Sequence, residues 1–564
     1  MRSRIEQYPH FFLSFFSLLF LSVFIGKVHL FDWDEVNFAT IAKEMVLSNH
    51  WSKITVDYLP FTDKPPLFFW MQALSMKLFG VNEWAARFPN VLAGIATLNL
   101  IFFLGKKYHG IETAKLWVLV YLGCFTSQIY FRSGIIDPWF NFFIYCSLYF
   151  FYKSIVSKRK SPFFLLVGVF LALAFLTKGP VSILVIGLVG LLYWMGKKFK
   201  IFFKPHHLLF ILFPIFLAIG SWYGFGQEGS PSKALWNFIN IQKALFSKNV
   251  ANHAQPFYYH PVILLFGMFP ASILAFLPLL KRKWLNESEV LGQLFRIFFW
   301  VVLILFSIVK TKIVHYSSMT YLPITYFAAL RLKNLSLNKI EKNLLWIVGT
   351  LLCISLASLA IIGNNVWESK SFLISNINNP INIQGLLLDG GWTQMELYIS
   401  TIFSLGLLTT LYTNKIKYLF LWISLFCPAL LISFAPKIEA HSQKVLVDFH
   451  QSHAKEDAYF ISHSFASYVP NFYARNHPYQ NSDKLLAERK SILKNLSCHS
   501  YSDLPLEKRA HFSNKIWHWC LCGDIDKTVY VSILKKHQHK MDAYPKLIFL
   551  YEKGPYAFYT RPIP

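Results

Sequence analysis

Two acidic segments and several basic turns carry the side chains best suited to chemistry. Asp34 and Glu35 lie where a helix is expected to begin, just after the first hydrophobic segment. A carboxylate there can act as a general base toward a hydroxyl group, or bind a cation. It can also cap the helix, so both interpretations of Asp34 stand. Three acidic residues in four positions, with Asp32 as the third, favour chemistry and predict Asp34 and Glu35 as catalytic.

A second carboxylate, Asp137, precedes Pro138 at the start of another apolar segment. Proline is common in the first helical turn, so Asp137 can simply cap that helix. The alternative is a second catalytic carboxylate that faces Asp34 across a cavity. Arg132, five residues earlier, would then pair with Asp137 or bind a phosphate.

Cations stand in short turns between apolar segments. Lysines in such places either extend to lipid headgroups or surround the phosphate of a lipid-linked substrate. The candidate substrate- or phosphate-binding residues are Lys64, Arg132, Lys178, Lys310, Lys312, His315 and Tyr316.

A metal site and a disulfide are further candidates. His253 and His260, with Asp63 nearby, would supply nitrogen and oxygen ligands to Zn²⁺, although the spacing of the two histidines matches no recognised ligand pattern. In the polar tail, Cys498 can pair with Cys520 or Cys522 if the tail is extracytoplasmic. The sequence leaves open whether either forms.

Composition indicates the elements that must position these residues. The 564-residue chain is 54% hydrophobic and only 15% charged, whereas soluble domains have roughly 25% charged residues. A net charge of +26 would suggest nucleic-acid binding in a soluble protein. Here the Lys and Arg residues form short clusters between apolar segments, as membrane orientation requires, so we expect no nucleic-acid partner. The composition predicts an all-α polytopic membrane protein with a polar tail.

Apolar segments predict about thirteen membrane spans, each near the roughly 20 residues that cross a bilayer. They lie near 11–30, 84–104, 114–131, 138–152, 162–177, 181–196, 206–223, 261–280, 291–309, 315–330, 343–363, 397–413 and 418–435. Basic loops alternate with less basic ones along the chain, which predicts a cytoplasmic N-terminus. The Asp34 loop, the Asp137 turn and the tail then lie on the outer side.

The chain divides into two parts. Residues 1–435 form the membrane domain, with an outer catalytic loop at 31–83, and residues 436–564 form a small α/β domain. Short apolar runs predict buried strands at 458–462, 528–532 and 547–551, and the segment 485–496 is expected to form a helix. Within the outer loop, an amphipathic helix with Lys43 and Glu44 on its polar face is expected to lie in the bilayer interface.

Several of these motifs together resemble a known family. Asp34-Glu35 followed by Phe38-Ala-Thr-Ile-Ala-Lys-Glu-Met45 resembles the first outer-loop motif of GT-C membrane glycosyltransferases. Specifically, it is similar to the protein O-mannosyltransferase/aminoarabinose-transferase superfamily. The resemblance covers most of 30–330 and continues through Asp63-Lys-Pro-Pro66, Phe79-Gly-Val-Asn-Glu-Trp-Ala-Ala-Arg-Phe-Pro89, Arg132 to Pro138, Lys178-Gly-Pro180, Ala254-Gln-Pro-Phe-Tyr-Tyr259 and Lys310 to Tyr316.

This resemblance implies a GT-C fold, a sugar donor carried on a polyprenyl phosphate, inversion at the anomeric carbon and Asp34 as the catalytic carboxylate. In the aminoarabinose branch an acidic residue near Lys-Pro-Pro and a later histidine hold zinc, and Asp63 and His253 fall at similar places. That branch usually has Glu where this chain has Asp63.

The expected function is transfer of a sugar to lipid A or another envelope glycan, on the periplasmic face of the bacterial inner membrane. Donor, acceptor and membrane lipids are the expected partners. Three alternatives stand: a protein O-glycosyltransferase of the same superfamily, a lipid flippase or transporter, and a non-catalytic envelope-assembly protein. A transporter would be expected to show charges within its spans and an inverted repeat, and the sequence shows few such charges and no evident repeat.

Overall fold

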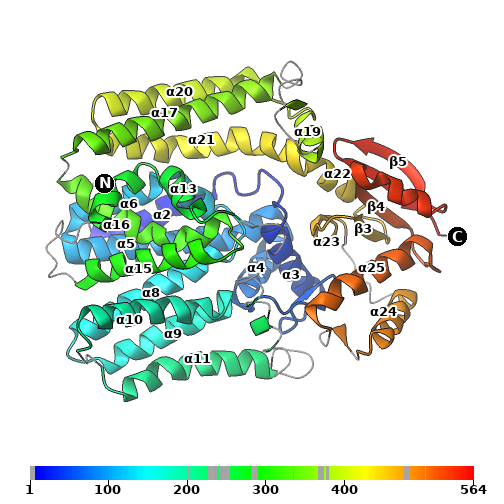
Figure 1. The fold of residues 1–564 in the computed structure, drawn as a ribbon, viewed down its shortest axis with the longest axis horizontal. Helices are drawn as coiled ribbons and strands as arrows, with labels where there is room; N and C mark the ends of the chain where they lie inside the picture. Colours follow the sequence, from blue (N-terminus) through cyan, green and yellow to red (C-terminus); the bar gives the residue numbers. More distant parts are fainter. Residues whose placement is uncertain are drawn as a thin grey trace.

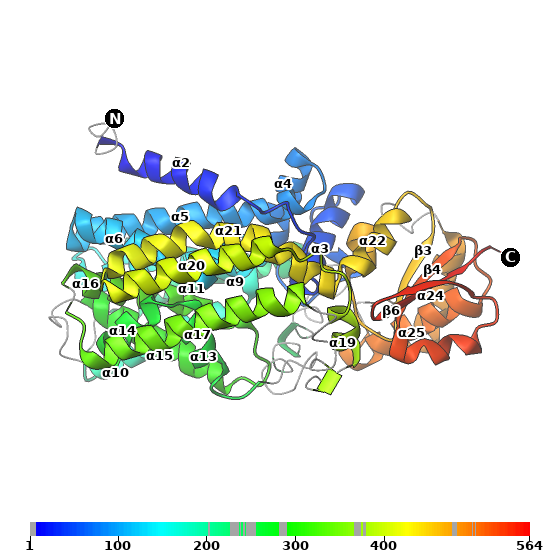
Figure 2. The same cartoon turned by 90° about the horizontal axis from the view of Figure 1, so that it is seen from above.

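The computed structural model describes residues 7–200, 203–225, 236, 238–240, 243, 255–280, 290–334, 336–365, 374–375, 380–475, 482–498, 500–501 and 504–563. Long helices lie side by side along the long axis of the molecule, and a smaller domain with a sheet covers one end (Figure 1). The N-terminus lies at the opposite end from the C-terminus (Figure 2).

The helices of the bundle are α2 (Pro9–Ser22), α5 (Glu83–His109), α6 (Ile111–Leu122), α7 (Phe125–Phe131), α8 (Asp137–Val156), α9 (Ser161–Lys178), α10 (Val181–Gly196), α11 (His206–Phe225), α13 (Tyr259–Gly267), α14 (Ala271–Leu280), α15 (Val290–Ile308), η1 (Val314–Thr320), α16 (Tyr321–Lys333), α17 (Lys339–Asn364), α19 (Pro380–Leu386), α20 (Gln394–Tyr412) and α21 (Ile416–Ser442).

These helices confirm a polytopic membrane protein. Among the described residues, seven helices are long and apolar enough to cross a membrane, and four apolar helices of 10–17 residues accompany them. Each predicted span corresponds to a helix or to a pair of helices. The pairs are α6 with α7, α13 with α14, and η1 with α16, where the predicted span is interrupted.

Local sequence accounts for where several helices begin and how closely they pack. Pro9, Pro138 and Pro162 stand in the first turns of α2, α8 and α9, where the missing N–H costs no hydrogen bond. Gly168 lets α11 approach α9, because a Cβ at this position would lie 2.5 Å from the carbonyl oxygen of Ile211. The membrane part is therefore held by close packing of helix on helix.

The outer segment folds between the bundle and the C-terminal domain. It consists of α3 (Asp34–Ser48), a hairpin of β1 (Thr55–Val56) and β2 (Leu59–Pro60), and α4 (Leu67–Phe79). The expectation that α3 lies in the bilayer interface is wrong. Lys43 and Glu44 are buried, with 2% and 4% of each residue exposed.

Protein contacts replace lipid and water on the polar face of α3. Lys43 Nζ donates to the carbonyl oxygen of Phe472, at 2.6 Å, in the C-terminal domain. The Glu44 carboxylate accepts hydrogen bonds from Thr55 Oγ1 and from the backbone N–H groups of Asp57 and Tyr58. Amphipathic spacing marked the polar face correctly but could not show that another domain covers it.

The C-terminal domain contains α22 (Lys444–Ser452), β3 (Tyr459–His463), α23 (Val469–Tyr473), α24 (Asp483–Asn495), α25 (Leu506–Cys522), β4 (Val529–Leu534), η4 (Lys535–Ala543), β5 (Ile548–Lys553) and β6 (Tyr556–Arg561). Its four strands form one sheet in the order β3-β4-β6-β5, with β3 parallel to β4 and the other pairs antiparallel.

Two expectations for the tail need correction. The strand predicted as buried at 547–551 is β5, an edge strand of the sheet, and all six of its residues are exposed, whereas β3 at the other edge is buried as predicted. The disulfide considered for Cys498 does not form, since all seven cysteines are free. Helix α21 also runs through position 435 to Ser442, past the expected domain boundary.

Candidate active site

One imidazole lies between the two predicted carboxylates. His315 Nε2 is 3.4 Å from Asp34 Oδ2 and 3.6 Å from Asp137 Oδ2. The three residues come from η1 and from the first positions of α3 and α8. Neither carboxylate forms a side-chain cap on its helix, so the capping interpretations of Asp34 and Asp137 are wrong.

Lys178 completes the cluster from the end of α9. Its Nζ donates to Asp137 Oδ1 at 2.5 Å and lies 4.8 Å from the centre of the Tyr316 ring. Gly179 follows with a φ of +94°, a conformation that ends the helix readily only at glycine. The Lys178-Gly179-Pro180 turn thus holds the ammonium group against Asp137.

Lys64 adds a second cation from the loop before α4. Burial lowers the pKa of Lys64, and the nearby charge of Lys178 lowers it further, while Asp34, Asp63 and Asp137 act in the opposite sense. The Asp34, Asp63 and Asp137 carboxylates offset the repulsion between the two ammonium groups. Lys64 and Lys178 thus place two cations near the Asp34 carboxylate, where an anionic group of a ligand can meet them.

The two carboxylates differ in exposure. The side chain of Asp34 is 35% exposed and that of Asp137 only 3%. Burial raises the pKa of Asp34, but the hydrogen bond and charge of His315, together with the charges of Lys64 and Lys178, lower it below its ordinary value of 3.8. Asp34 is thus an ionised, accessible carboxylate, whereas Asp137 holds Lys178 in place.

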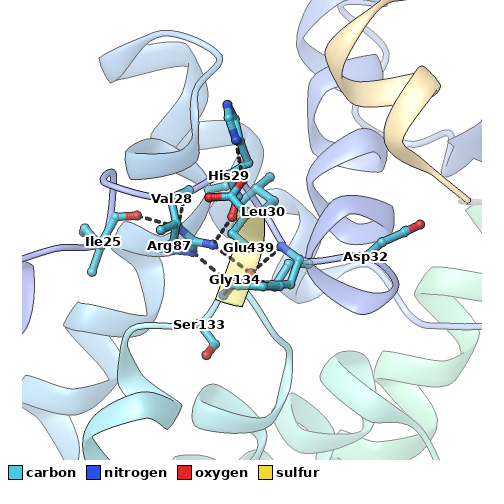
Figure 3. A network of polar contacts seen from close by, with 12 residues as sticks. Ile25, Val28, His29, Leu30, Asp32, Arg87, Ser133, Gly134 and Glu439 are labelled. Carbon is cyan, nitrogen blue, oxygen red and sulfur yellow. Dashed lines mark hydrogen bonds and ion pairs between the residues drawn. The ribbon is translucent and has the colours of Figure 1, made fainter. Parts of the chain in front are cut away.

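Glu35 lies beside Asp34 but faces a different set of groups. Arg87 donates from Nε to Glu35 Oε1 at 3.0 Å and from Nη2 to Oε2 at 2.8 Å. Arg87 also binds the carbonyl oxygens of Ile25, Val28 and His29 (Figure 3). The N–H groups of Phe31 and Gly134 donate to the same carboxylate. These contacts favour a structural role for Glu35, in place of the predicted catalytic one.

Arg87 itself was missed at the sequence level. It falls inside the predicted span 84–104, where a charge in a hydrophobic segment signals a buried partner. Its guanidinium ties the loop after α2 to α5 and, through Glu35, fixes the start of α3. The position of Asp34 depends on this anchor.

Three predicted phosphate-binding residues have other surroundings. Arg132 donates to the carbonyl oxygens of Phe20, Val23 and Gln128, so it anchors the end of α2 rather than a ligand. Lys312 Nζ donates to the carbonyl oxygen of Gln255 at 2.9 Å, and Lys310 is exposed. The cations gathered around the carboxylates are Lys64 and Lys178.

The predicted metal ligands are not seen together. His253 lies outside the described residues. Asp63 Oδ1 is 3.6 Å from Arg509 Nη1, and a guanidinium at this distance does not fit a cation site. Among the residues that the structure describes, no group of three or more His, Cys, Asp or Glu side chains could hold a metal ion.

The C-terminal domain contributes to the site, which sequence reasoning missed. The N–H of Tyr468 donates to Asp32 Oδ1 at 3.2 Å, next to Asp34. Burial raises the pKa of Tyr468, as do the charges of Asp63, Asp32 and Asp34. Nothing in the local sequence signals a contact across more than 400 residues.

Sequence comparison finds similar membrane glycosyltransferases. Residues 63–222 match the family model described as dolichyl-phosphate-mannose-protein mannosyltransferase. An undecaprenyl phosphate-alpha-4-amino-4-deoxy-L-arabinose arabinosyl transferase of Edwardsiella ictaluri is 28% identical over 327 residues, which are 56% of this chain and 57% of that enzyme. The enzyme of the same name from Serratia proteamaculans is 26% identical over 400 residues, which are 67% of this chain and 69% of that enzyme.

A solved structure agrees over nearly the whole fold. The crystal structure of ArnT from Cupriavidus metallidurans bound to undecaprenyl phosphate has a TM-score of 0.73 at 15% identity, and the match covers 98% of this chain and 97% of that one. This chain therefore has the fold of that structure, and its sequence is similar to the mannosyltransferase family model and to the arabinosyl transferases named above. The predicted fold is thus confirmed, and the comparisons agree with the resemblance to GT-C glycosyltransferases noted from the sequence. The Edwardsiella relative is matched over little more than half of its length.

Proposed function

We propose that this GT-C protein transfers a sugar from a polyprenyl-phosphate donor to a lipid or glycan acceptor, with aminoarabinose and lipid A as the first candidates. The observation that carries the proposal is the cluster of Asp34, His315, Asp137 and Lys178 at one end of a membrane bundle. The names of the similar enzymes support the choice of donor.

In this proposal, Asp34 acts on the acceptor, and the lysines act on the phosphate group that leaves. Asp34, ionised and accessible, would orient the acceptor oxygen and take its proton where that oxygen is a hydroxyl. As the acceptor oxygen bonds to the anomeric carbon, the bond from that carbon to the donor phosphate breaks. The electron pair leaves with the polyprenyl phosphate, and Lys64 and Lys178 would stabilise the charge that develops there. Attack from the opposite face inverts the anomeric carbon.

The arrangement of the helices supports an orientation in the bilayer. Asp34, Asp137 and Lys178 lie at one end of their helices, so the loops that follow α5, α8 and α10 lie at the other end. Lys106 and Lys107 stand in the last turn of α5, and the loops after α8 and α10 carry Lys158, Arg159, Lys197 and Lys198. By the positive-inside rule we place them and the N-terminus in the cytoplasm of a bacterium, with the site and the C-terminal domain in the periplasm. We set the domain boundary after Ser442, where α21 ends.

A metal remains a hypothesis for this chain. Asp63 and His253 stand where the aminoarabinose branch holds zinc, but the Arg509 guanidinium beside Asp63 does not fit a cation site. The proposed mechanism therefore uses no metal-dependent step.

A protein hydroxyl is the second candidate acceptor, because the matching family model describes protein mannosyltransferases. Lipid and protein acceptors can be offered together in one assay. Purified protein in proteoliposomes would receive undecaprenyl-phosphate-linked radiolabelled aminoarabinose, with lipid A and a Ser/Thr-rich peptide. We expect label in the lipid fraction; label in the peptide would favour the second candidate.

The same assay tests the enzyme assignment. Asp137→Asn should lose transfer, because Lys178 then loses its ionic partner. Asp524→Asn, at a carboxylate whose side chain is 81% exposed in the C-terminal domain, is the matched control and should keep it. Wild-type protein that leaves the donor intact with every acceptor offered would overturn the proposal.

A further inference from the structure

A cavity of about 390 Å³ lies between the β1–β2 hairpin and the C-terminal domain. The hairpin wall is firmly held: Glu44 binds the turn from one side, and Arg475 and Arg489 bind Asp57 from the other. Tyr468 also lines this cavity, and its backbone N–H donates to Asp32 Oδ1 at 3.2 Å, two residues from Asp34. The cavity therefore opens beside the candidate active site.

Two buried polar atoms at this cavity lack hydrogen-bond partners. They are Asp63 Oδ1 and Arg509 Nε. The two side chains face each other at 3.6 Å, and Arg509 also donates from Nη2 to Thr62 Oγ1 at 3.3 Å. A buried acceptor and a buried donor left unsatisfied are costly. Hydroxyl groups of a sugar, each both donor and acceptor, would satisfy both atoms.

A second cavity, of about 520 Å³, adjoins the first, and both are lined by Asn514 and Trp517. Its wall carries cationic and titratable side chains: Lys515, Lys540, His463, His511 and His518. No Asp or Glu is among its lining residues in the described part of the chain. Burial lowers the pKa of His463, and the charges of Lys540 and His537 lower it further, which marks a positive potential.

We propose that the two adjoining cavities form an acceptor-binding groove for an anionic saccharide, with a second anion site on the C-terminal domain. Asp63 and Arg509 bind a sugar ring near the reacting centre, Trp517 packs against the saccharide at the junction, and Lys515 and Lys540 bind a phosphate or carboxylate further along. The inference rests on the proposed function and adds to it where the acceptor is recognised.

The chemistry of the two cavities argues for one ligand that spans both. A cavity rich in aromatic rings, amides and buried polar atoms suits a sugar, whereas a cavity with lysines and no lining carboxylate suits an anion. Because Asn514 and Trp517 line both cavities, one ligand can occupy both cavities and stay in contact with the protein between them. A polyprenyl-phosphate donor has its anion beside the reacting carbon, so a remote anion belongs to the acceptor.

Binding to the whole protein in nanodiscs tests the inference without turnover. The probe is a soluble glucosamine disaccharide bisphosphate, compared with the unphosphorylated disaccharide and with inorganic phosphate alone. We expect the bisphosphate to bind at least about tenfold more tightly than either comparison compound, since each charge-assisted contact contributes on this scale. Equal binding of the bisphosphate and inorganic phosphate would overturn the saccharide assignment.

Charge reversal locates the anion site. Lys515→Glu and Lys540→Glu should each weaken bisphosphate binding by about tenfold and raise the KM for the acceptor, with the KM for the donor unchanged. Lys536→Glu is the matched control, because Lys536 is exposed in η4 but lines neither cavity. Lys515→Gln and Lys540→Gln repeat the test should a reversed charge disturb folding.

The outcomes separate this inference from the proposed function. Wild-type transfer with bisphosphate binding that is indifferent to Lys515 and Lys540 would refute the groove and leave the enzyme assignment intact. Absence of transfer, with binding that depends on both lysines, would overturn the enzyme assignment and retain a saccharide site. Asp137→Asn should bind the probe like the wild-type protein, because binding does not require the reacting carboxylates.

Discussion

Asp34 and Asp137 face the same imidazole, since His315 Nε2 lies 3.4 Å from one carboxylate and 3.6 Å from the other. Lys178 binds the more buried of the two, and the accessible one is left for an acceptor. In the proposed mechanism, His315 lies between Asp34 on the acceptor side and the Asp137–Lys178 pair on the side of the departing phosphate. The predictions below follow from this arrangement and from the contacts that support it.

Replacing His315 should impair the chemical step. His315→Gln removes the imidazole that helps to keep the pKa of Asp34 low, and its amide cannot match the imidazole's contact with both carboxylates. We expect kcat to fall by about a hundredfold, in the range of a positioned acid–base group, with the KM for the donor little changed. Steady-state kinetics in proteoliposomes measure both; a variant with unchanged kcat would remove His315 from the mechanism.

Lys178 should be sensitive to charge and shape. Lys178→Ala leaves Asp137 without its ionic partner and the departing phosphate without a cation, so kcat should fall by about a hundredfold or more. Lys178→Arg keeps the charge and should recover part of the activity. Lys115→Ala, at a lysine exposed on α6, controls for loss of surface charge. Equal activity of the Ala and Arg variants would show that charge at this position is irrelevant.

The ion pair of Arg87 and Glu35 should stabilise the folded protein. Arg87→Ala leaves a buried carboxylate without its cation, which costs about 3–5 kcal/mol. We expect a clear fall in Tm in detergent, while Arg159→Ala, at an exposed arginine, should leave Tm unchanged. The double variant Glu35→Gln/Arg87→Met should recover part of the loss, because no unpaired charge remains. Unchanged Tm in Arg87→Ala would contradict this account of the network.

Asp32 should make the stability depend on pH. Burial raises the pKa of Asp32 from 3.8 to about 6, so the folded protein retains this proton at pH values where the unfolded chain has lost it. The free energy of unfolding therefore falls as pH rises from about 4 through 6. Asp32→Asn retains the oxygen that accepts from Tyr468 but cannot ionise. The Tm of Asp32→Asn should therefore fall less than the wild-type Tm between about pH 4 and pH 6. Wild-type and variant Tm values that fall in parallel with pH would contradict the raised pKa of Asp32.

The sequence predicted those features of the fold that follow from hydrophobic length and from the distribution of charge along the chain. Hydrophobic length located the helices, because each span must satisfy its own backbone in lipid. The alternation of basic and less basic loops predicted that Asp34, Asp137 and Lys178 lie on the same side of the membrane. The burial of Lys43 and Glu44 was not predictable in this way, since it depends on a domain folded from residues more than 400 positions later. The same holds for Arg509 beside Asp63.

The sequence was less informative where residue type alone suggested a role. Arg132 and Glu35 are charged residues near the site, and their types fit phosphate binding and catalysis equally well. Their contacts are with backbone groups and with Arg87. A charged side chain that holds the fold together differs from one that binds a ligand in the hydrogen bonds it makes within the protein. The spacing of residues in the sequence does not show these hydrogen bonds.

Single-turnover transfer by Asp34→Asn tests the central claim most directly. Wild-type protein and the variant are loaded with undecaprenyl-phosphate-linked radiolabelled aminoarabinose, and label reaching lipid A is followed after mixing. We predict that Asp34→Asn binds the donor as tightly as wild type does but transfers at least about a thousandfold more slowly, since its neutral amide neither orients the acceptor oxygen as the carboxylate does nor takes a proton from a hydroxyl. Transfer by Asp34→Asn at the wild-type rate would contradict the assignment of Asp34 and, with it, the mechanism built on this cluster.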